Sequence, residues 1–219
     1  GKACKFLDTP VVSGNVSLYN ETDNIAIQPC PVIGMVGLIG DWKTAVEIGF
    51  TKAGEAIFVI GQPPDCVDGW LGNSLFAKTI AGCEGGAPPP IDLKIEKAHG
   101  QFVRKQIAAG QIKAAHDISD GGLLVAISEM ALSGNLGADI KIPDSDTVLG
   151  WAFGEDQARY LVQVEDAAKF QTLLDENNLQ GHQIGTTTDS QILTAGPDVT
   201  ISIEEIRQSN ESKLPDMMA

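Results

Sequence analysis

The stretch AAHDISDGGLLVAISEMALSG, residues 114–134, sets the organisation of the chain most clearly. Its first five residues predict a brief strand or extended piece at 114–118. Residues 123–132 are apolar almost throughout and predict a helix, which Gly134 ends. Gly121 and Gly122 separate the two elements. The stretch therefore predicts a unit of strand, glycine turn and helix.

Two interpretations of this turn are open. A helix that starts at two glycines has unpaired N–H groups and a partial positive charge, which together suit an anion. Asp117 and Asp120 would repel a phosphate there unless Mg²⁺ intervened. Alternatively, Ser119 or Asp120 caps the helix and the glycines only allow tight packing of strand against helix.

The flanking segments predict a mixture of helices and antiparallel strands. The expected strands are 56–61, 138–142, 159–164 and 182–187, with a final hairpin of 191–194 and 199–203. The expected helices are 73–81 with Asn73 as N-cap, 93–109 ended by Gly110, and 166–177; residues 85–90 form a loop, and a polar tail starts at Glu204. This order predicts an α+β or mixed-sheet α/β fold with helices on one face, as opposed to a doubly wound parallel sheet.

The first 47 residues predict a separate part of the chain. Residues 1–7 resemble the end of a helix, so we expect the chain to begin inside a larger fold. Residues 10–19 and 25–39 predict an antiparallel strand pair, and a new domain is expected near Ile48. Within PVVSGNVSLYNE, residues 10–21, Ser-Gly-Asn is either a plain turn or a site where a phosphate or metal meets backbone N–H, amide and hydroxyl groups.

Composition restricts the function classes. The 219-residue chain is 43% hydrophobic and carries a net charge of −14, which argues against a nonspecific nucleic-acid partner. It has no apolar run long enough for a membrane span and no secretory signal pattern, so we expect a cytoplasmic protein. The spacing of the cysteines suggests neither zinc nor redox chemistry, and we expect reduced thiols at Cys4, Cys30, Cys66 and Cys83.

Three motifs together carry a family resemblance. They are residues 10–21, HDISDGGL at 116–123 and FGEDQARYLV at 153–162, and the tail IEEIR at 203–207 with Leu214-Pro215 supports them. In order and spacing they resemble the second half of the synthetase subunit of phosphoribosylformylglycinamidine synthase, in the aminoimidazole ribonucleotide (AIR) synthase superfamily. The resemblance implies that residues 1–47 end a truncated A-type domain and that 48–219 form a B-type domain, with the PurM C-terminal-like fold.

The resemblance also implies an activity: an ATP-dependent ligase of purine biosynthesis that converts formylglycinamide ribonucleotide to the formamidine. The implied cofactors are ATP and Mg²⁺, and ammonia comes from a glutaminase subunit assembled with a small bridging subunit. By position in the motif, Gly14 contacts ATP, Asn15 binds Mg²⁺ and Ser17 touches the ribonucleotide. No catalytic residue is assigned, because the family's catalytic histidine lies in the missing N-terminal half, so we expect this fragment to be inactive alone.

Two alternatives and several smaller expectations remain. The chain is either a noncatalytic nucleotide-binding scaffold that docks a glutaminase, or another ATP-dependent enzyme of the superfamily. Strand edges left by the absent A-type domain predict that the fragment dimerises. We expect His116 to be a hydrogen-bonded structural residue and His99 and His182 to be surface or packing residues. The remaining candidates, Glu155, Asp156 and Arg159, form either a charged cluster near a nucleotide or a solvated ion-pair network.

Overall fold

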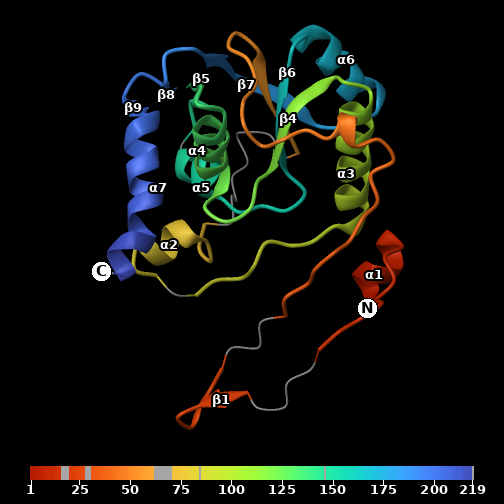
Figure 1. The fold of residues 1–219 in the computed structure, drawn as a ribbon, viewed down its shortest axis with the longest axis vertical. Helices are drawn as coiled ribbons and strands as arrows, with labels where there is room; N and C mark the ends of the chain where they lie inside the picture. Colours follow the sequence, from red (N-terminus) through yellow and green to blue (C-terminus); the bar gives the residue numbers. More distant parts are fainter. Residues whose placement is uncertain (16–19, 28–30, 62–70, 84, 146, 219) are drawn as a thin grey trace. The chain divides into compact units, whose positions relative to one another are not determined.

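The computed structural model describes residues 1–15, 20–27, 31–61, 71–83, 85–145 and 147–218 (Figure 1). They form two compact units, Gly1–Lys43 and Thr44–Ala219, which we describe separately. No helix in these ranges is both long and apolar enough to cross a membrane.

The larger unit is built on a seven-stranded sheet. Its strands, in the spatial order β4-β6-β3-β7-β5-β8-β9, are Ile112–Asp117, Tyr160–Val164, Ala56–Ile60, Gly181–Thr188, Gly137–Ile140, Ile192–Ala195 and Val199–Ser202. Neighbouring strands pair antiparallel except β5 and β8, which are parallel. The predicted mixed sheet is therefore confirmed, and so is each predicted strand in this unit, with shifts of one or two residues at the ends.

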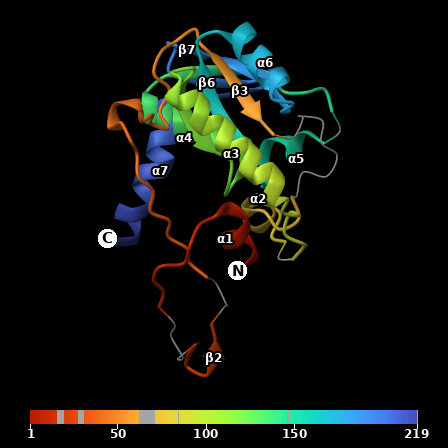
Figure 2. The ribbon, with the colours of Figure 1, turned by 90° about the vertical axis from the view of Figure 1, so that its right-hand side faces the viewer.

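Helices cover both faces of this sheet. They are α2 Leu75–Thr79, α3 Leu93–Ala108, α4 Gly122–Gly134, α5 Val148–Phe153, α6 Ala167–Glu176 and α7 Ile203–Met218. Figures 1 and 2 show α3 and α6 on one side of the strands and α4 and α7 on the other. The expectation that helices cover one face only is wrong.

The reason lies in the central strand β3, whose five residues are all buried. Its side chains alternate between two hydrophobic cores, with Ile57 and Val59 packed in the core of α4, α5 and α7. Phe58 and Ile60 pack in the core of α3 and α6, where the ring of Phe58 lies 5.2 Å from that of Phe170. A strand that is apolar on both faces must be covered by helices on both sides of the sheet. Helices on one side are enough only where the other face of the sheet is polar and solvated.

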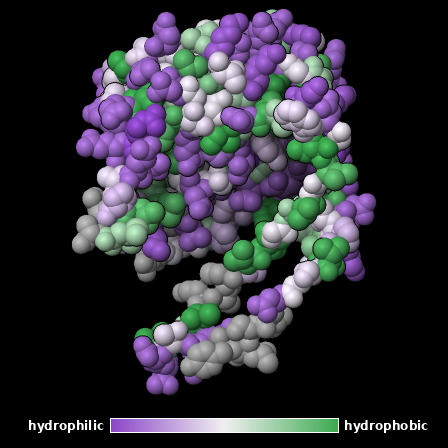
Figure 3. Space-filling view, viewed as in Figure 1, coloured by the Kyte–Doolittle hydropathy of each residue, from purple (hydrophilic) through white to green (hydrophobic). Residues whose placement is uncertain are grey.

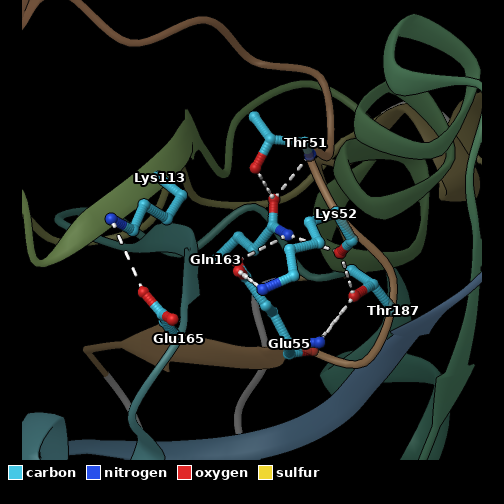
Figure 4. A network of polar contacts seen from close by, with 7 residues as sticks. All are labelled: Thr51, Lys52, Glu55, Lys113, Gln163, Glu165 and Thr187. Carbon is cyan, nitrogen blue, oxygen red and sulfur yellow. Dashed lines mark hydrogen bonds and ion pairs between the residues drawn. The ribbon is translucent and has the colours of Figure 1, made fainter.

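A buried glutamine attaches the segment before β3 to the sheet (Figure 4). Gln163 on β6 is fully buried, and its Oε1 accepts a hydrogen bond from the Thr51 backbone N–H at 2.8 Å. Its Nε2 donates to the Lys52 carbonyl at 2.8 Å and to Glu55 Oε2 at 3.0 Å. Thr187 on β7 donates from Oγ1 to the same Lys52 carbonyl at 2.7 Å. Each polar group of Gln163 is thus satisfied within the fold.

The smaller unit contains little regular structure. Its elements are α1 Lys2–Leu7, β1 Glu21–Thr22, β2 Ile25–Ala26 and the start of a 3₁₀ turn at Trp42–Thr44. A helix is confirmed at 2–7, and that it is the end of a longer helix stays a prediction. The long strands predicted at 10–19 and 25–39 are wrong over the described residues, since 10–15 and 31–39 have no strand. The pair that does form joins β1, which lies outside both predicted strands, to β2, which is two residues of the predicted strand 25–39. Residues 16–19 and 28–30 lie outside the described residues.

The larger unit differs from the predictions in three further places. The N-cap of α2 is Ser74, whose Oγ accepts from the Ala77 N–H at 3.2 Å, and not Asn73. Helix α5 was not predicted. The expected polar tail is helix α7, which begins with a capping box: Ser202 Oγ accepts from the Glu205 N–H at 3.1 Å, and Glu205 Oε2 accepts from the Ser202 N–H at 2.9 Å.

Candidate functional site

The glycine turn between β4 and α4 has a backbone that requires glycine. Gly121 and Gly122 have φ angles of +82° and +74°. A Cβ atom on Gly122 would lie 2.6 Å from the carbonyl carbon of Phe153, so the turn packs directly against the end of α5. The strand, turn and helix predicted at 114–134 are confirmed, and the turn is held close to the segment 153–155.

The carboxylate of Glu155 binds the N-terminal end of α4. Its Oε1 accepts hydrogen bonds from the Gly121 N–H at 2.9 Å and from the Leu75 N–H, at the start of α2, at 2.8 Å. The N-cap residue of α4 is Gly121, with no side-chain cap, so the expectation that Ser119 or Asp120 caps the helix is wrong. The N-terminal end of a helix carries a partial positive charge, which stabilises a nearby negative group. At α4 this negative group is the carboxylate of Glu155 and not a bound anion.

An aromatic contact strengthens the same junction. The rings of Phe76 on α2 and Phe153 on α5 stack with centroids 4.6 Å apart. Glu155 and Phe153 therefore hold α2 and the glycine turn together. No short-range pattern indicates this, because Glu155 lies 34 residues after Gly121 and 80 residues after Leu75.

Asp156 and Arg159 form a buried ion pair. Arg159 Nη1 lies 3.4 Å from Asp156 Oδ2, and the two residues are only 4% and 5% exposed. The interpretation of these residues as a solvated ion-pair network is wrong for this pair. A buried charge needs a partner, so the pair fixes the conformation of the turn before β6.

The three histidines lie in different environments. His116 is half-buried; its Nε2 lies 2.9 Å from Glu129 Oε2 and its Nδ1 lies 3.2 Å from Asp117 Oδ1. It joins β4 to α4, as expected of a hydrogen-bonded structural histidine. His99 is buried on α3, with Nδ1 2.6 Å from the Ala158 carbonyl oxygen. His182 is half-buried on β7. Both were expected to be surface or packing residues, and the structure shows His99 packed inside the fold.

Of the predicted ligand-binding residues, Gly14 and Asn15 are exposed neighbours in a stretch without regular structure. Ser17 lies outside the described residues. A Cβ atom on Gly14 would meet no atom within 4 Å, and the described ranges contain no group of three His, Cys, Asp or Glu side chains that could hold a metal. The roles of Gly14, Asn15 and Ser17 therefore remain predictions.

A family model for the C-terminal domain of AIR synthase related proteins matches residues 52–196. The match spans most of the larger unit, from the segment before β3 to the end of β8. The chain belongs to the AIR synthase related family, and the fold implied by the motifs is confirmed for this unit.

Among individual proteins, the chain is similar to phosphoribosylformylglycinamidine synthase subunit PurL. It is 47% identical over 220 residues to that subunit of Rhodopseudomonas palustris strain TIE-1, an alignment that covers 99% of this chain and 29% of the relative. It is 46% identical over 223 residues to that of Parvibaculum lavamentivorans, covering 100% of this chain and 30% of the relative. The resemblance is confirmed, and the chain spans less than a third of its relatives' length.

Among solved structures, T. maritima PurL complexed with FGAR has a TM-score of 0.62 with this chain at 19% identity. The alignment covers 75% of this chain and 30% of that one. At this identity the likeness concerns the fold alone, and it agrees with the mixed sheet described above.

Proposed function

We propose that this chain is part of an ATP-dependent ligase that makes formylglycinamidine ribonucleotide, ADP and phosphate from formylglycinamide ribonucleotide, ATP and ammonia. The observation that carries the proposal is the 47% identity to a PurL subunit across 99% of the chain. The reaction belongs to purine biosynthesis. T. maritima PurL structures complexed with ATP, ADP and FGAR support the class of ligand for that protein.

In this proposal the stretch at 10–21 supplies ligand contacts. Gly14 lets the backbone approach ATP, Asn15 holds Mg²⁺ through its amide oxygen, and Ser17 donates its hydroxyl to the ribonucleotide. Asn15 fits such a role as one neutral, exposed oxygen donor. The described residues offer no carboxylate cluster beside it, and the proposal takes the further ligands from the rest of the full-length protein. The metal supplies neutralisation of phosphate charge.

The larger unit has a supporting role in the proposal. The glycine turn, Glu155 and the stacked Phe76 and Phe153 join α2, α4 and α5 into one rigid junction. This chain supplies no catalytic residue in the proposal, and it acts with the N-terminal half, a glutaminase and a small bridging subunit in the cytoplasm.

The test is ammonium-supported release of phosphate from ATP, measured with and without formylglycinamide ribonucleotide. The 219-residue chain is compared with the product of the same gene extended through the missing half. We expect turnover that depends on the ribonucleotide only in the extended protein. Absence of turnover in both proteins would overturn the ligase proposal and favour a noncatalytic scaffold; turnover with a different substrate would favour another enzyme of the superfamily.

Residue roles are tested in the extended protein. Asn15→Ala and Ser17→Ala are expected to lower turnover strongly while the thermal unfolding midpoint stays unchanged. Unchanged turnover in both variants would contradict their assignment. Self-association of the fragment is a separate expectation, and light scattering that shows only monomer across micromolar concentrations would contradict it.

A further inference from the structure

A groove of about 840 Å³ opens beside the first half of α3. Its walls come from α3, from residues 89–91 before that helix, and from the segments 156–158 and 178–180. This volume is within the range of sites that enclose small molecules, and its lining mixes apolar with polar residues as such sites do.

His99 brings a defined hydrogen-bonding group to the groove. The residue is 7% exposed and lines the groove. Its Nδ1 lies 2.6 Å from the Ala158 carbonyl oxygen, which can only accept, so Nδ1 carries the hydrogen. Neutral His99 therefore has its lone pair on Nε2, for which the described residues provide no hydrogen-bond donor. This lone pair can accept a hydrogen bond from a ligand in the groove that carries a donor.

Residues 156–158 form a closely packed part of the groove wall that includes one strained residue. Ala158 has a φ angle of +60°, in the left-handed region that alanine rarely adopts. Its carbonyl accepts from His99, and the neighbouring Arg159 pairs with buried Asp156. A Cβ atom on Gly61 would lie 2.9 Å from Arg159 Cγ, so β3 also packs against this turn. A strained backbone conformation persists only where the surrounding contacts hold it. For Ala158 these contacts are the hydrogen bond to His99 and the packing of Arg159.

The groove is lined by one lysine, Lys94, and two carboxylates, Asp92 and Asp156. The two lining carboxylates already have partners: Asp92 Oδ1 caps α3 by accepting from the Lys94 N–H at 2.8 Å, and Asp156 pairs with Arg159. The Lys94 ammonium makes none of the ion pairs found among the described residues, and it is the cation among the lining residues. Apolar contact area comes from Ile91, Ile95 and Leu179.

We propose that this groove binds a small organic anion with an apolar body, which places its acidic group at Lys94 and donates a hydroxyl or amide hydrogen to His99 Nε2. The inference goes beyond the ligase function and does not depend on it, because the assay below measures binding and not turnover. Lys94 and His99 are binding residues in this proposal, and Ala158 orients the imidazole.

The test uses 4-hydroxybenzoate as probe, because it combines an apolar ring, a carboxylate and a hydroxyl donor. The 219-residue chain has three histidines, so the His99 ring Cε1–H signal can be assigned with single variants and followed by NMR during titration. We expect a saturable shift of this signal. Benzoate lacks the donor and phenol lacks the carboxylate, so each is expected to bind about tenfold more weakly.

Matched variants separate binding from folding. His99→Asn keeps a donor for the Ala158 carbonyl but removes the Nε2 acceptor, and Lys94→Met removes the charge while keeping the apolar stem. Each is expected to weaken 4-hydroxybenzoate binding about tenfold, followed by the amide signals of Ala98 and Leu179. His116→Asn should leave binding unchanged. Absence of a saturable shift in the parent chain would overturn the proposal, and so would binding by His99→Asn and Lys94→Met as tight as that of the parent chain.

Discussion

Both units of this chain contain runs of apolar residues, but these side chains are exposed in the smaller unit and buried in the larger one. None of the described residues of Gly1–Lys43 is buried, and Val32, Val36 and Leu38 are 97%, 104% and 100% exposed. In Thr44–Ala219 every residue of β3 is buried. Figure 3 shows the same contrast, with hydrophobic side chains of the smaller unit uncovered on the surface. An apolar run forms a long strand only where a partner strand and a packed face are available.

The largest expected effect sharpens this contrast between the units. Phe58→Ala removes a ring that is 1% exposed and packs edge-on against Phe170. We expect a loss of about 4 kcal/mol in the free energy of unfolding, from lost burial and the cavity that remains. Leu38→Ala, at a fully exposed position, is the control and should change it by less than about 0.5 kcal/mol. Urea titrations give both values, and equal losses would contradict the contrast.

Glycines provide the next comparison. Gly122→Ala introduces a Cβ atom 2.6 Å from the Phe153 carbonyl carbon at a φ angle of +74°. We expect a loss of about 3 kcal/mol, since left-handed strain and overpacking add together. Gly14→Ala meets no atom within 4 Å, so the unfolding midpoint of that variant should equal that of the parent chain. A stable Gly122→Ala variant would mean that the turn is less tightly packed against α5 than described.

The buried network of Gln163 predicts a smaller and more local effect. Gln163→Ala leaves the Thr51 N–H and the Lys52 carbonyl without the bonds of 2.8 Å that the side chain makes. We expect a loss of about 2 kcal/mol and faster hydrogen exchange of the Thr51 amide. Gln183→Ala, whose exposed side chain bonds only to the Gly185 carbonyl at 3.1 Å, is the control. Unchanged exchange at Thr51 would contradict the anchoring role of Gln163.

The sequence was sufficient for elements with a clear local pattern of apolar residues. The continuous apolar run at 56–60 predicted β3, and the helical spacing of Ala98, Phe102 and Ile107 predicted α3. The sequence was insufficient for features that depend on contacts between residues far apart in the chain. The sequence predicts a polar tail in place of helix α7 because most residues from Glu204 to Lys213 are polar, although the capping box of Ser202 and Glu205 is a usable local signal for a helix.

The candidate site was also predicted only in part, because local pattern determines some of it and long-range contacts determine the rest. The strand, turn and helix at 114–134 follow from local pattern, whereas the group that caps α4 does not. Glu155 is brought to Gly121 and Leu75 by the packing of α5, and no spacing rule connects residues 34 and 80 positions apart. The strands predicted around Gly14 and Asn15 fail in the opposite way: the local pattern is present, and the described residues of that unit supply no packed face for it.

The smallest effect concerns the ionisation of Tyr160 on β6. Burial, followed by the carboxylates of Glu96 and Asp117, raises the pKa of this phenol above the ordinary value of 10.0. Because the fold favours the neutral form, its contribution to stability is complete below the unfolded-state pKa and is lost as pH rises through the folded-state pKa. Tyr160→Phe should therefore lose less stability than the parent chain over this alkaline range.

The titration can be followed by near-ultraviolet absorbance. The chain has two tyrosines, Tyr19 and Tyr160, so Tyr19→Phe leaves Tyr160 as the only phenol. We expect it to titrate above its ordinary pKa in the folded chain and at the ordinary value in urea. Titration of the folded Tyr19→Phe variant at or below the urea value would mean that β6 is open to water beside α3, and that the larger unit is less firmly closed than its burial indicates.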